Sequence, residues 1–165
     1  MSLVGHAWVF GDNIDTDLLA PGPMMRKPID VLAQHCLSAV DPQFAGNVQR
    51  GDIVVGGTGF GIGSSREQAV QALLHLGVGC IIAKSFARIF YRNALNLGLP
   101  VLVCSDLLVS TGDQLEVNPA HGIVINRSTA QEYRCEPIPP ELMHIVAAGG
   151  LLPYLATLRD RRTSS

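Results

Sequence analysis

The stretch that decides the fold covers residues 53–104 and reads IVVGGTGFGIGSSREQAVQALLHLGVGCIIAKSFARIFYRNALNLGLPVLVC. It contains three apolar runs, at residues 53–55, 79–83 and 99–104, separated by two segments whose apolar residues recur at helical spacing. Continuous apolar strands that alternate with helices are typical of a parallel sheet covered by helices. These residues therefore predict an α/β fold with a parallel β-α-β-α-β core.

Serine and glycine residues give the expected limits of the two helices. Ser64 and Glu67 have the spacing of a capping box, which predicts that the first helix begins there and ends at Gly77. Ser85 is in position to cap the second helix, which is expected over residues 86–97.

The rest of the chain is expected to extend this core on both sides. A short strand precedes a loop without periodicity at residues 14–27, and an antiparallel part follows the core. The predicted elements are strands at residues 7–10, 114–117, 123–126 and 132–135, helices at residues 31–40 and from Pro139 to Gly149, and a frayed polar tail at residues 159–165.

Length and composition limit the classes of protein. With 165 residues, 47% hydrophobic and 16% charged, the chain is expected to form one globular domain over residues 1–165. So apolar a chain has either a large core or apolar surface that faces a partner. The formal net charge of −2 gives no electrostatic attraction to nucleic acid or to an anionic membrane. No apolar run approaches about 18 residues and no signal peptide is recognisable, so a cytoplasmic location is expected.

The four cysteines give no sign of a metal site. Cys36, Cys80, Cys104 and Cys135 lie far apart and form no Cys-x-x-Cys pair. Because the local ligand spacing of a zinc ion or an iron–sulfur cluster is absent, we expect the chain to hold no metal by itself. The thiols are expected to be reduced.

The strongest local signal for chemistry is the glycine-rich loop at residues 56–63, which leads into Ser64, Ser65 and Arg66. Glycines let the backbone approach a ligand, and a helix start offers free N–H groups. Two hydroxyls and a guanidinium at that point suit an anion site with a potential nucleophile or base. The dinucleotide and phosphate-loop patterns do not fit, because Arg66 stands where the first needs glycine and no Lys-Ser or Lys-Thr follows the glycines. The plain alternative is a helix cap after a tight turn.

The loop at residues 14–27 holds further candidates. Arg26 could clamp a carboxylate, or it could simply be solvated. Met24 and Met25 could line an apolar pocket or cover the core. Asp15 and Asp17 alternate around one threonine, which suits either a cation or arginine partner or an Asx-type turn.

Three of these segments together resemble one known family. They are GDNIDTD at residues 11–17, GFGIGSSRE at residues 59–67 and AKSFARIFYRNA at residues 83–94. They resemble the small subunits of 3-isopropylmalate dehydratase, which correspond to the swivelling domain of the aconitase superfamily. The resemblance runs from about residue 9 to residue 116. It implies a swivelling β/β/α domain in which an antiparallel C-terminal part is added to the parallel core.

The resemblance also implies roles for individual residues. Ser64 would be the catalytic base that removes the proton next to a carboxylate, with a helix N-terminus beside it. Ser65, Arg66 and Arg26 would bind substrate carboxylates. The specificity loop would be Met24, Met25 and Lys27, with Asp17 lining the site and no metal in this chain.

The implied activity needs a second chain. The family's large subunit carries a [4Fe–4S] cluster, and the two chains together dehydrate and rehydrate 2-isopropylmalate to 3-isopropylmalate in leucine biosynthesis. The alternatives are a related hydro-lyase subunit acting on homoaconitate, citramalate or dimethylmalate, or a non-catalytic carboxylate-binding module. The retained serines and arginines argue against the module. Self-association of the isolated chain is a further expectation.

Two positions depart from the family pattern. Ile62 stands where the family usually has cysteine, and Gln68 where it usually has histidine. Neither position carries the base or a carboxylate clamp, so the reaction class is expected to survive while the shape of the site changes.

Overall fold

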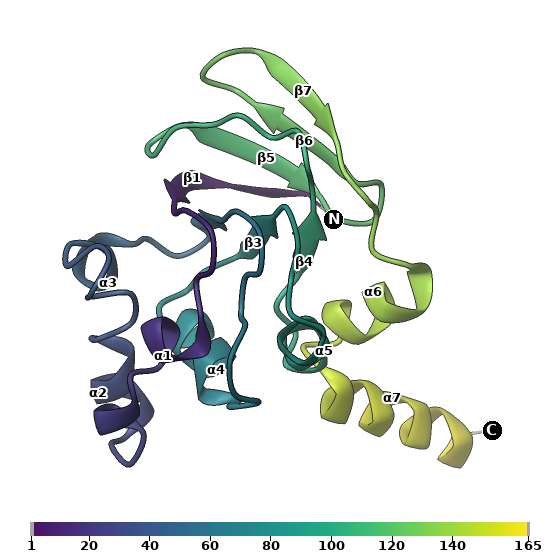
Figure 1. Cartoon of the computed structure of the whole chain (residues 1–165). Coiled ribbons are helices and arrows are strands. Elements are labelled where there is room, and N and C mark those ends of the chain that lie inside the picture. Colours follow the sequence, from purple (N-terminus) through teal and green to yellow (C-terminus); the bar gives the residue numbers. More distant parts are fainter. Residues whose placement is uncertain (1, 165) are drawn as a thin grey trace.

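A computed structural model describes residues 2–164 and contains one seven-stranded sheet, with the strand order β4-β3-β2-β1-β5-β6-β7 (Figure 1). The first four strands in that order are parallel to one another, and the last three pair in antiparallel fashion. The bounds are β1 Leu3–Val9, β2 Ile53–Val55, β3 Cys80–Ala83, β4 Val101–Val103, β5 Gln114–Asn118, β6 Ile123–Asn126 and β7 Gln131–Arg134. The predicted parallel core and the added antiparallel part are both confirmed.

Strand β1 joins the two halves of the sheet. Its end, Ala7 to Val9, pairs in parallel with β2, whereas its beginning, Leu3 to His6, pairs in antiparallel fashion with β5. The strand therefore starts four residues before the predicted one. Residues 3–6 alternate between half-buried and exposed positions, a weaker apolar signal than that of β2 or β3.

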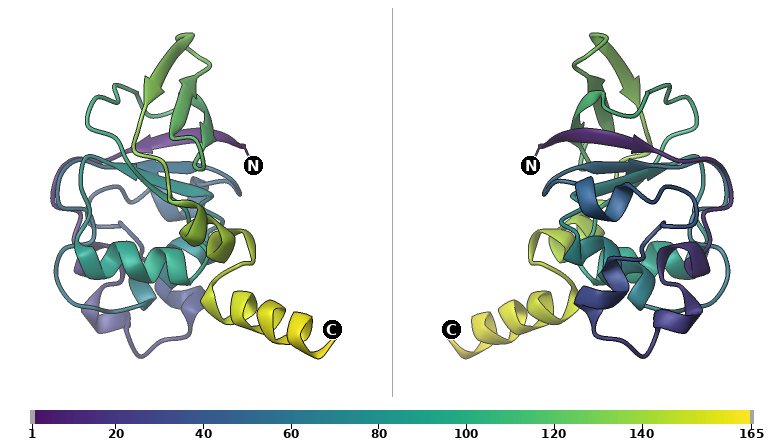
Figure 2. Two further views of the ribbon diagram at one scale, coloured as in Figure 1. Left: turned by 90° about the vertical axis from the view of Figure 1, so that its right-hand side faces the viewer. Right: turned by 90° about the vertical axis from the view of Figure 1, so that its left-hand side faces the viewer.

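The sheet curls so that its two ends meet. An antiparallel bridge links Val103 in the edge strand β4 with Glu136, just after β7. Figures 1 and 2 show the helices gathered on one side of the parallel strands, while β5–β7 arch over the other side. This arrangement gives the expected β/β/α layers.

The helices are short and lie mostly between the parallel strands in sequence. They are α1 Thr16–Leu19, the 3₁₀-helix η1 Gly22–Met24, α2 Ile29–Ala33, α3 Phe44–Asn47, α4 Gln68–His75, α5 Arg88–Asn96, α6 Pro140–Ala147 and α7 Leu151–Thr163. Among residues 2–164, no single helix is long and apolar enough to cross a membrane, and α6 and α7 pass that test only together, across a bend of 93°.

Two predictions outside the parallel core, one for residues 31–40 and one for residues 159–165, were wrong. The helix expected at residues 31–40 ends at Ala33 and continues as turns, with Leu37 in the left-handed region at φ 59°. The tail expected to be frayed is the last part of α7, which continues to Thr163, and Ser165 lies outside the described residues. This helix buries none of its residues, so no apolar stripe marked it in the sequence.

An aromatic cluster packs the glycine-rich loop against the start of α5. Phe60 is 1% exposed and packs edge-on against Phe86, with ring centroids 5.8 Å apart, and against Phe90 at 5.5 Å. Gly61 has φ 84°, and a Cβ atom there would lie 2.1 Å from the Phe90 ring. The loop can therefore lie close on α5 only because this residue is glycine.

Candidate functional site

The candidate site forms where two loops leave the carboxyl ends of β1 and β2. The backbone N–H of Asn13 donates to the carbonyl of Thr58 at 2.8 Å, and the N–H of Thr58 donates to Asp12 Oδ1 at 2.8 Å. Segment 11–17 and the glycine-rich loop are therefore held side by side. In open α/β sheets this edge is where ligands bind.

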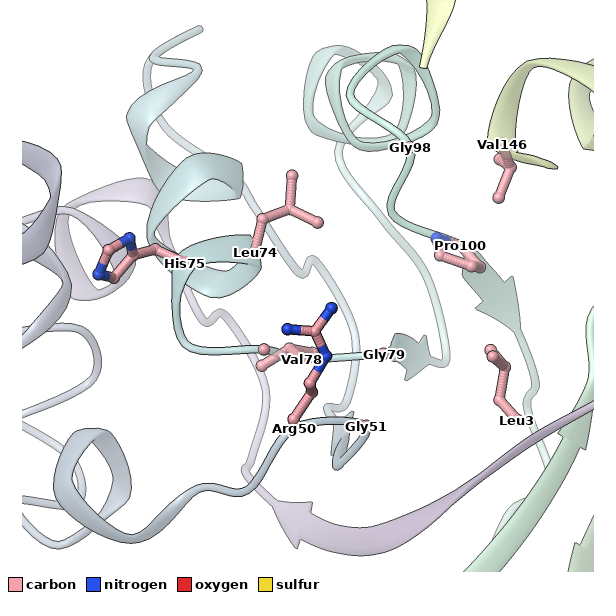
Figure 3. Close-up of a pocket in the computed structure, with 11 residues that line it drawn as sticks. Leu3, Arg50, Gly51, Leu74, His75, Val78, Gly79, Gly98, Pro100 and Val146 are labelled. Carbon is pink, nitrogen blue, oxygen red and sulfur yellow. The ribbon is translucent and has the colours of Figure 1, made fainter. Parts of the chain in front are cut away.

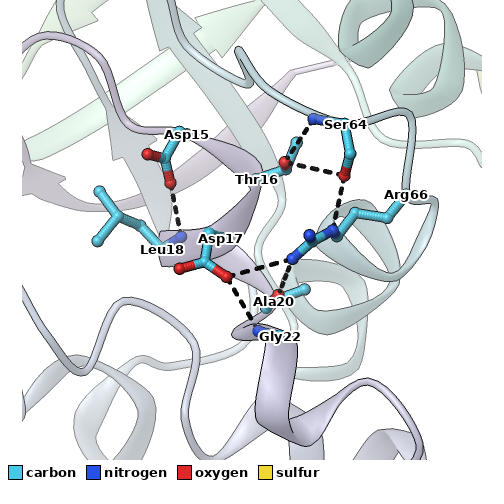
Figure 4. Close-up of polar contacts among 8 residues, drawn as sticks. All are labelled: Asp15, Thr16, Asp17, Leu18, Ala20, Gly22, Ser64 and Arg66. Carbon is cyan, nitrogen blue, oxygen red and sulfur yellow. Dashed lines mark hydrogen bonds and ion pairs between the residues drawn. The ribbon is translucent and has the colours of Figure 1, made fainter.

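Ser64 lies at the centre of the contacts between these loops (Figure 4). Its backbone N–H donates to Thr16 Oγ1 at 3.1 Å, and its Oγ lies 3.3 Å from the same Thr16 oxygen. Arg66 Nε donates to Ser64 Oγ at 2.6 Å. Gly63 makes this approach possible, because a Cβ atom there would lie 2.7 Å from Thr16 Oγ1.

The guanidinium of Arg66 is fixed by a second set of contacts. Its Nη1 donates to the carbonyl of Ala20 at 2.8 Å and lies 3.4 Å from Asp17 Oδ1, which also accepts from the N–H of Gly22 at 3.0 Å. Nη2 makes no hydrogen bond with any residue in 2–164, so it remains as a donor for a ligand carboxylate. The side chain of Arg66 is 24% exposed.

These contacts hold the positively charged guanidinium of Arg66 against the Ser64 hydroxyl. A charge-assisted hydrogen bond of this kind stabilises a serine oxygen that loses its proton, because the cation is close and already oriented. Ser64 is exposed, so a ligand can approach its hydroxyl from solvent.

The expected capping box was wrong. Helix α4 begins at Gln68, and its N-cap residue Glu67 makes no side-chain capping bond. The hydroxyl of Ser64 is already engaged by Thr16 and Arg66, and residues 64–67 precede the helix without belonging to it. The positive group in contact with Ser64 is thus a guanidinium and not a helix N-terminus.

The predicted cap of the second helix also has another partner. Ser85 Oγ accepts from the N–H of Gly59 at 2.9 Å, and α5 begins only at Arg88. Ser85 therefore holds the glycine-rich loop. Helix α5 fixes the other end of the site, because Asn93 Nδ2 donates to the carbonyl of Ser65 at 3.2 Å and leaves the exposed Ser65 hydroxyl free.

The two aspartates that flank Thr16 serve different partners. Asp15 caps α1 by accepting from the N–H of Leu18 at 2.8 Å, whereas Asp17 pairs with Arg66. Both alternatives considered for these residues, a turn cap and an arginine partner, are therefore present. Sequence reasoning missed Thr16 itself, which is 3% exposed. Its position between two charged residues was the only local signal.

The expected specificity loop lies just beyond Asp17, in and after η1. Met24 and Met25 are partly buried against the core, while Arg26 and Lys27 are exposed. The side chain of Arg26 forms no hydrogen bond or ion pair with any residue in 2–164. The structure thus places Arg26 in the loop that follows the Asp17–Arg66 contact and does not bring it into contact with Ser64.

A cavity of about 370 Å³ lies at the opposite edge of the sheet, beside Leu3, Gly51 and Pro100 (Figure 3). These residues mark the amino ends of the parallel strands. Arg50 and His75 line the cavity close to the end of α4. None of the residues of the candidate site lines this cavity.

No cluster of three or more metal-ligating side chains occurs within residues 2–164. Cys36 and Cys80 are buried, and burial raises the pKa of both thiols. A protonated, buried thiol is a poor metal ligand. The residues present therefore do not fit an iron–sulfur cluster in this chain.

The chain matches the aconitase C-terminal domain family over residues 22–106. It is 47% identical over 157 residues to 3-isopropylmalate dehydratase small subunit 2 of Archaeoglobus fulgidus, with 94% of this chain and 95% of the relative covered. A crystal structure of a 3-isopropylmalate dehydratase from Methanocaldococcus jannaschii superposes with a TM-score of 0.94 at 39% identity and covers 99% of both chains.

Relatives with other named substrates are about as similar. The isopropylmalate/citramalate isomerase small subunit of M. jannaschii is 46% identical and covers 92% of each chain. The methanogen homoaconitase small subunit of Methanothermobacter thermautotrophicus is 46% identical, with 93% of this chain and 91% of the relative covered. All of these names denote small subunits, which implies a larger partner chain. By fold and sequence, the chain belongs to the aconitase C-terminal domain family, among the small subunits of 3-isopropylmalate dehydratases and related isomerases.

Proposed function

We propose that this chain is the small subunit of a hydro-lyase that interconverts 2-isopropylmalate and 3-isopropylmalate in leucine biosynthesis. Ser64 removes the proton next to a carboxylate, and Ser65, Arg66 and Arg26 bind carboxylate groups of the substrate. The observation that carries the proposal is the 2.6 Å hydrogen bond from Arg66 Nε to Ser64 Oγ, within a chain of this family. A serine needs such a partner to act as a base near neutral pH.

The proposed proton transfer uses groups that the fold already orients. When Ser64 Oγ is ionised, Arg66 Nε offsets its charge and Thr16 Oγ1 turns its hydroxyl hydrogen toward it. The oxygen then takes the proton from the substrate carbon and becomes a neutral hydroxyl. In the rehydration step the same hydroxyl gives a proton to the carbon that lost its hydroxyl group, while a hydroxyl group adds to the carbon that lost its proton. One residue thereby serves both halves of an isomerisation that proceeds through an unsaturated acid.

The departing hydroxyl group requires chemistry that this chain does not contain. We assign it to a [4Fe–4S] cluster in the large subunit, because the residues of this chain do not fit such a cluster. The two chains would form one active site at their interface, with the base and the carboxylate clamps on this side. We place the assembly in the cytoplasm.

The proposal must also say which side group the malate-type substrate carries. Met24 and Met25 are flexible and apolar, which suits the isopropyl group of a branched alkylmalate. The names of the relatives favour citramalate and homoaconitate as second candidates. Lys27 adds a cation that would suit the additional carboxylate of homoaconitate.

Co-purification with a candidate large subunit, followed by turnover assays, tests the proposal. We expect a stable complex and the highest kcat/KM for 2-isopropylmalate among 2-isopropylmalate, citramalate, dimethylmalate and homoaconitate. A preference for homoaconitate or citramalate would change the proposed substrate but would leave the proposed reaction, a dehydration followed by a rehydration, unchanged. A stable complex that turns over none of these acids, although its large subunit carries an intact cluster, would favour a non-catalytic carboxylate-binding module.

A further inference from the structure

Two of the four cysteines meet where the curled sheet closes on itself. The bridge between Val103 and Glu136 is antiparallel, and the N–H of Glu136 donates to the carbonyl of Val103 at 3.0 Å. In that register the next opposing pair is Cys104 and Cys135. We call this contact, residues 103–104 against residues 135–136, the seam.

The register brings the two sulfurs to the same face. Directly opposed residues of an antiparallel pair lie about 4.5–5.5 Å apart at Cα, and their side chains point to one side. Disulfides need a Cα separation of about 4.4–6.8 Å. The backbone on each side is fixed, because Cys104 N–H donates to Ala83 at 2.9 Å and Cys135 N–H donates to Gly122 at 2.7 Å.

Each thiol affects the acidity of the other. The Cys135 side chain lowers the pKa of Cys104 to about 7, and Cys104 in turn raises the pKa of Cys135. The Cys104 thiol also lies 3.9 Å from the carbonyl oxygen of Arg134, which accepts from it. Cys104 is 3% exposed and Cys135 is partly exposed, so a water-sized reagent can approach the pair from the Cys135 side. By contrast, burial raises the pKa of both Cys36 and Cys80.

We propose that Cys104 and Cys135 form a peroxide-responsive redox pair that closes to an intramolecular disulfide across the seam. The Cys104 thiolate attacks one oxygen of hydrogen peroxide, the O–O bond breaks, and water leaves after protonation, which gives a sulfenic acid. The Cys135 sulfur then attacks the Cys104 sulfur, the S–O bond breaks, and a second water leaves. Two thiols thereby give two electrons to one peroxide. The inference does not depend on the proposed activity.

The disulfide would lock β4 to the segment after β7 and close the sheet into a covalent ring. It would form near the site edge, because Ala83, whose carbonyl accepts from the Cys104 N–H, is followed by Lys84, whose N–H donates to the carbonyl of Gly57 at 3.1 Å. The glycine-rich loop therefore begins two hydrogen-bonded steps from the seam.

The test uses the full, reduced chain in its native state. Brief exposure to hydrogen peroxide should lower the mass of the chain by about 2 Da. Alkylation under denaturing conditions should then label only Cys36 and Cys80, and digestion should give one cross-linked peptide that joins Cys104 to Cys135. Dithiothreitol should reverse both changes. Oxidation should raise Tm by roughly 5–10 °C, as expected for a disulfide that closes a loop of this size.

Matched variants separate the pair from general oxidation. Cys135→Ser should abolish the cross-link and the Tm increase, whereas Cys36→Ser should preserve both. The peptide map of the unsubstituted chain decides the matter even where a variant fails to fold. Free, alkylated Cys104 and Cys135 after oxidation, links to Cys36 or Cys80, links between chains, or sulfinic acid at Cys104 without a cross-link would each overturn the proposal.

Discussion

Ser64 has three contacts that bear on its reactivity: its N–H and Oγ both meet Thr16 Oγ1, and its Oγ accepts from Arg66 Nε. Ser64→Ala removes the proposed base and keeps the backbone contact. We expect kcat of the assembled enzyme to fall by about 10²–10⁴-fold, the usual range for a positioned base. Stability should fall by only about 1 kcal/mol. Ser105→Ala is the control, because Ser105 is exposed and, among residues 2–164, its hydroxyl hydrogen-bonds only to Asp106. Near-normal turnover by Ser64→Ala would leave Ser64 with a purely structural role.

Thr16 is expected to orient Ser64 rather than to touch substrate. Thr16→Val keeps the shape and removes the acceptor of the Ser64 N–H, which leaves a polar group unpaired at a cost of about 1–3 kcal/mol. We expect a lower Tm and a tenfold or greater loss of kcat with little change in KM. Thr16→Ser should restore most of both. A variant that lost stability but kept kcat would show that the orientation of Ser64 does not depend on Thr16.

Among single residues, the sequence predicted those site candidates that lie in short segments rich in polar side chains. It singled out Ser64, Arg66 and Asp17, and the structure brings these three together. It could not find Thr16, because the partner lies 48 residues away and a threonine between two aspartates has an ordinary local explanation.

At the scale of elements, the loop after α1 carries the proposed second carboxylate clamp. Arg26→Lys keeps the charge and loses the planar fork, so we expect KM to rise and kcat/KM to fall tenfold to a hundredfold. That range corresponds to roughly 1.5–3 kcal/mol for a charge-assisted hydrogen bond. Lys27→Ala is measured in parallel, since Lys27 is the neighbouring cation, and a silent Arg26→Lys beside a crippled Lys27→Ala would move the clamp to Lys27.

The same loop should decide which alkyl group is accepted. Met24 and Met25 lie partly buried beside the exposed Arg26. Replacing either methionine with leucine should reorder kcat/KM among 2-isopropylmalate, citramalate and dimethylmalate, and the best kcat should change little. An unchanged order for both variants would exclude the two methionines from the specificity loop.

The starts of α4 and α5 were both predicted too early in the chain, and the reason is physical. Ser64 and Ser85 have good capping positions, but each hydroxyl is taken by a partner far along the chain, Thr16 and Gly59 respectively. Local patterns cannot show that competition. The interiors of α4 and α5 were predictable, because their apolar stripes are buried in the core.

At the scale of the whole molecule, the parallel core was predictable because β2 and β3 are fully buried and therefore read as unbroken apolar runs. The double pairing of β1 and the seam at Val103 were not, since both depend on how the antiparallel half curls over the parallel half. Helix α7 was not predicted because none of its residues is buried, so its apolar residues do not follow a helical spacing that the sequence could show.

The division of the active site between two chains gives the last prediction. Anaerobic treatment of the isolated chain with iron and sulfide should give no stoichiometric cluster absorbance, because Cys36, Cys80 and Cys104 are buried and form no ligand group with other residues in 2–164. The isolated chain should also show no dehydratase activity, and adding the large subunit should restore it. Arg26→Lys, treated in parallel, should behave identically in the absorbance assay, because it alters a clamp and not a ligand. A stable cluster in the isolated chain would contradict the assignment of the metal chemistry to the partner, since thiols now held in the core would have to leave it to bind iron.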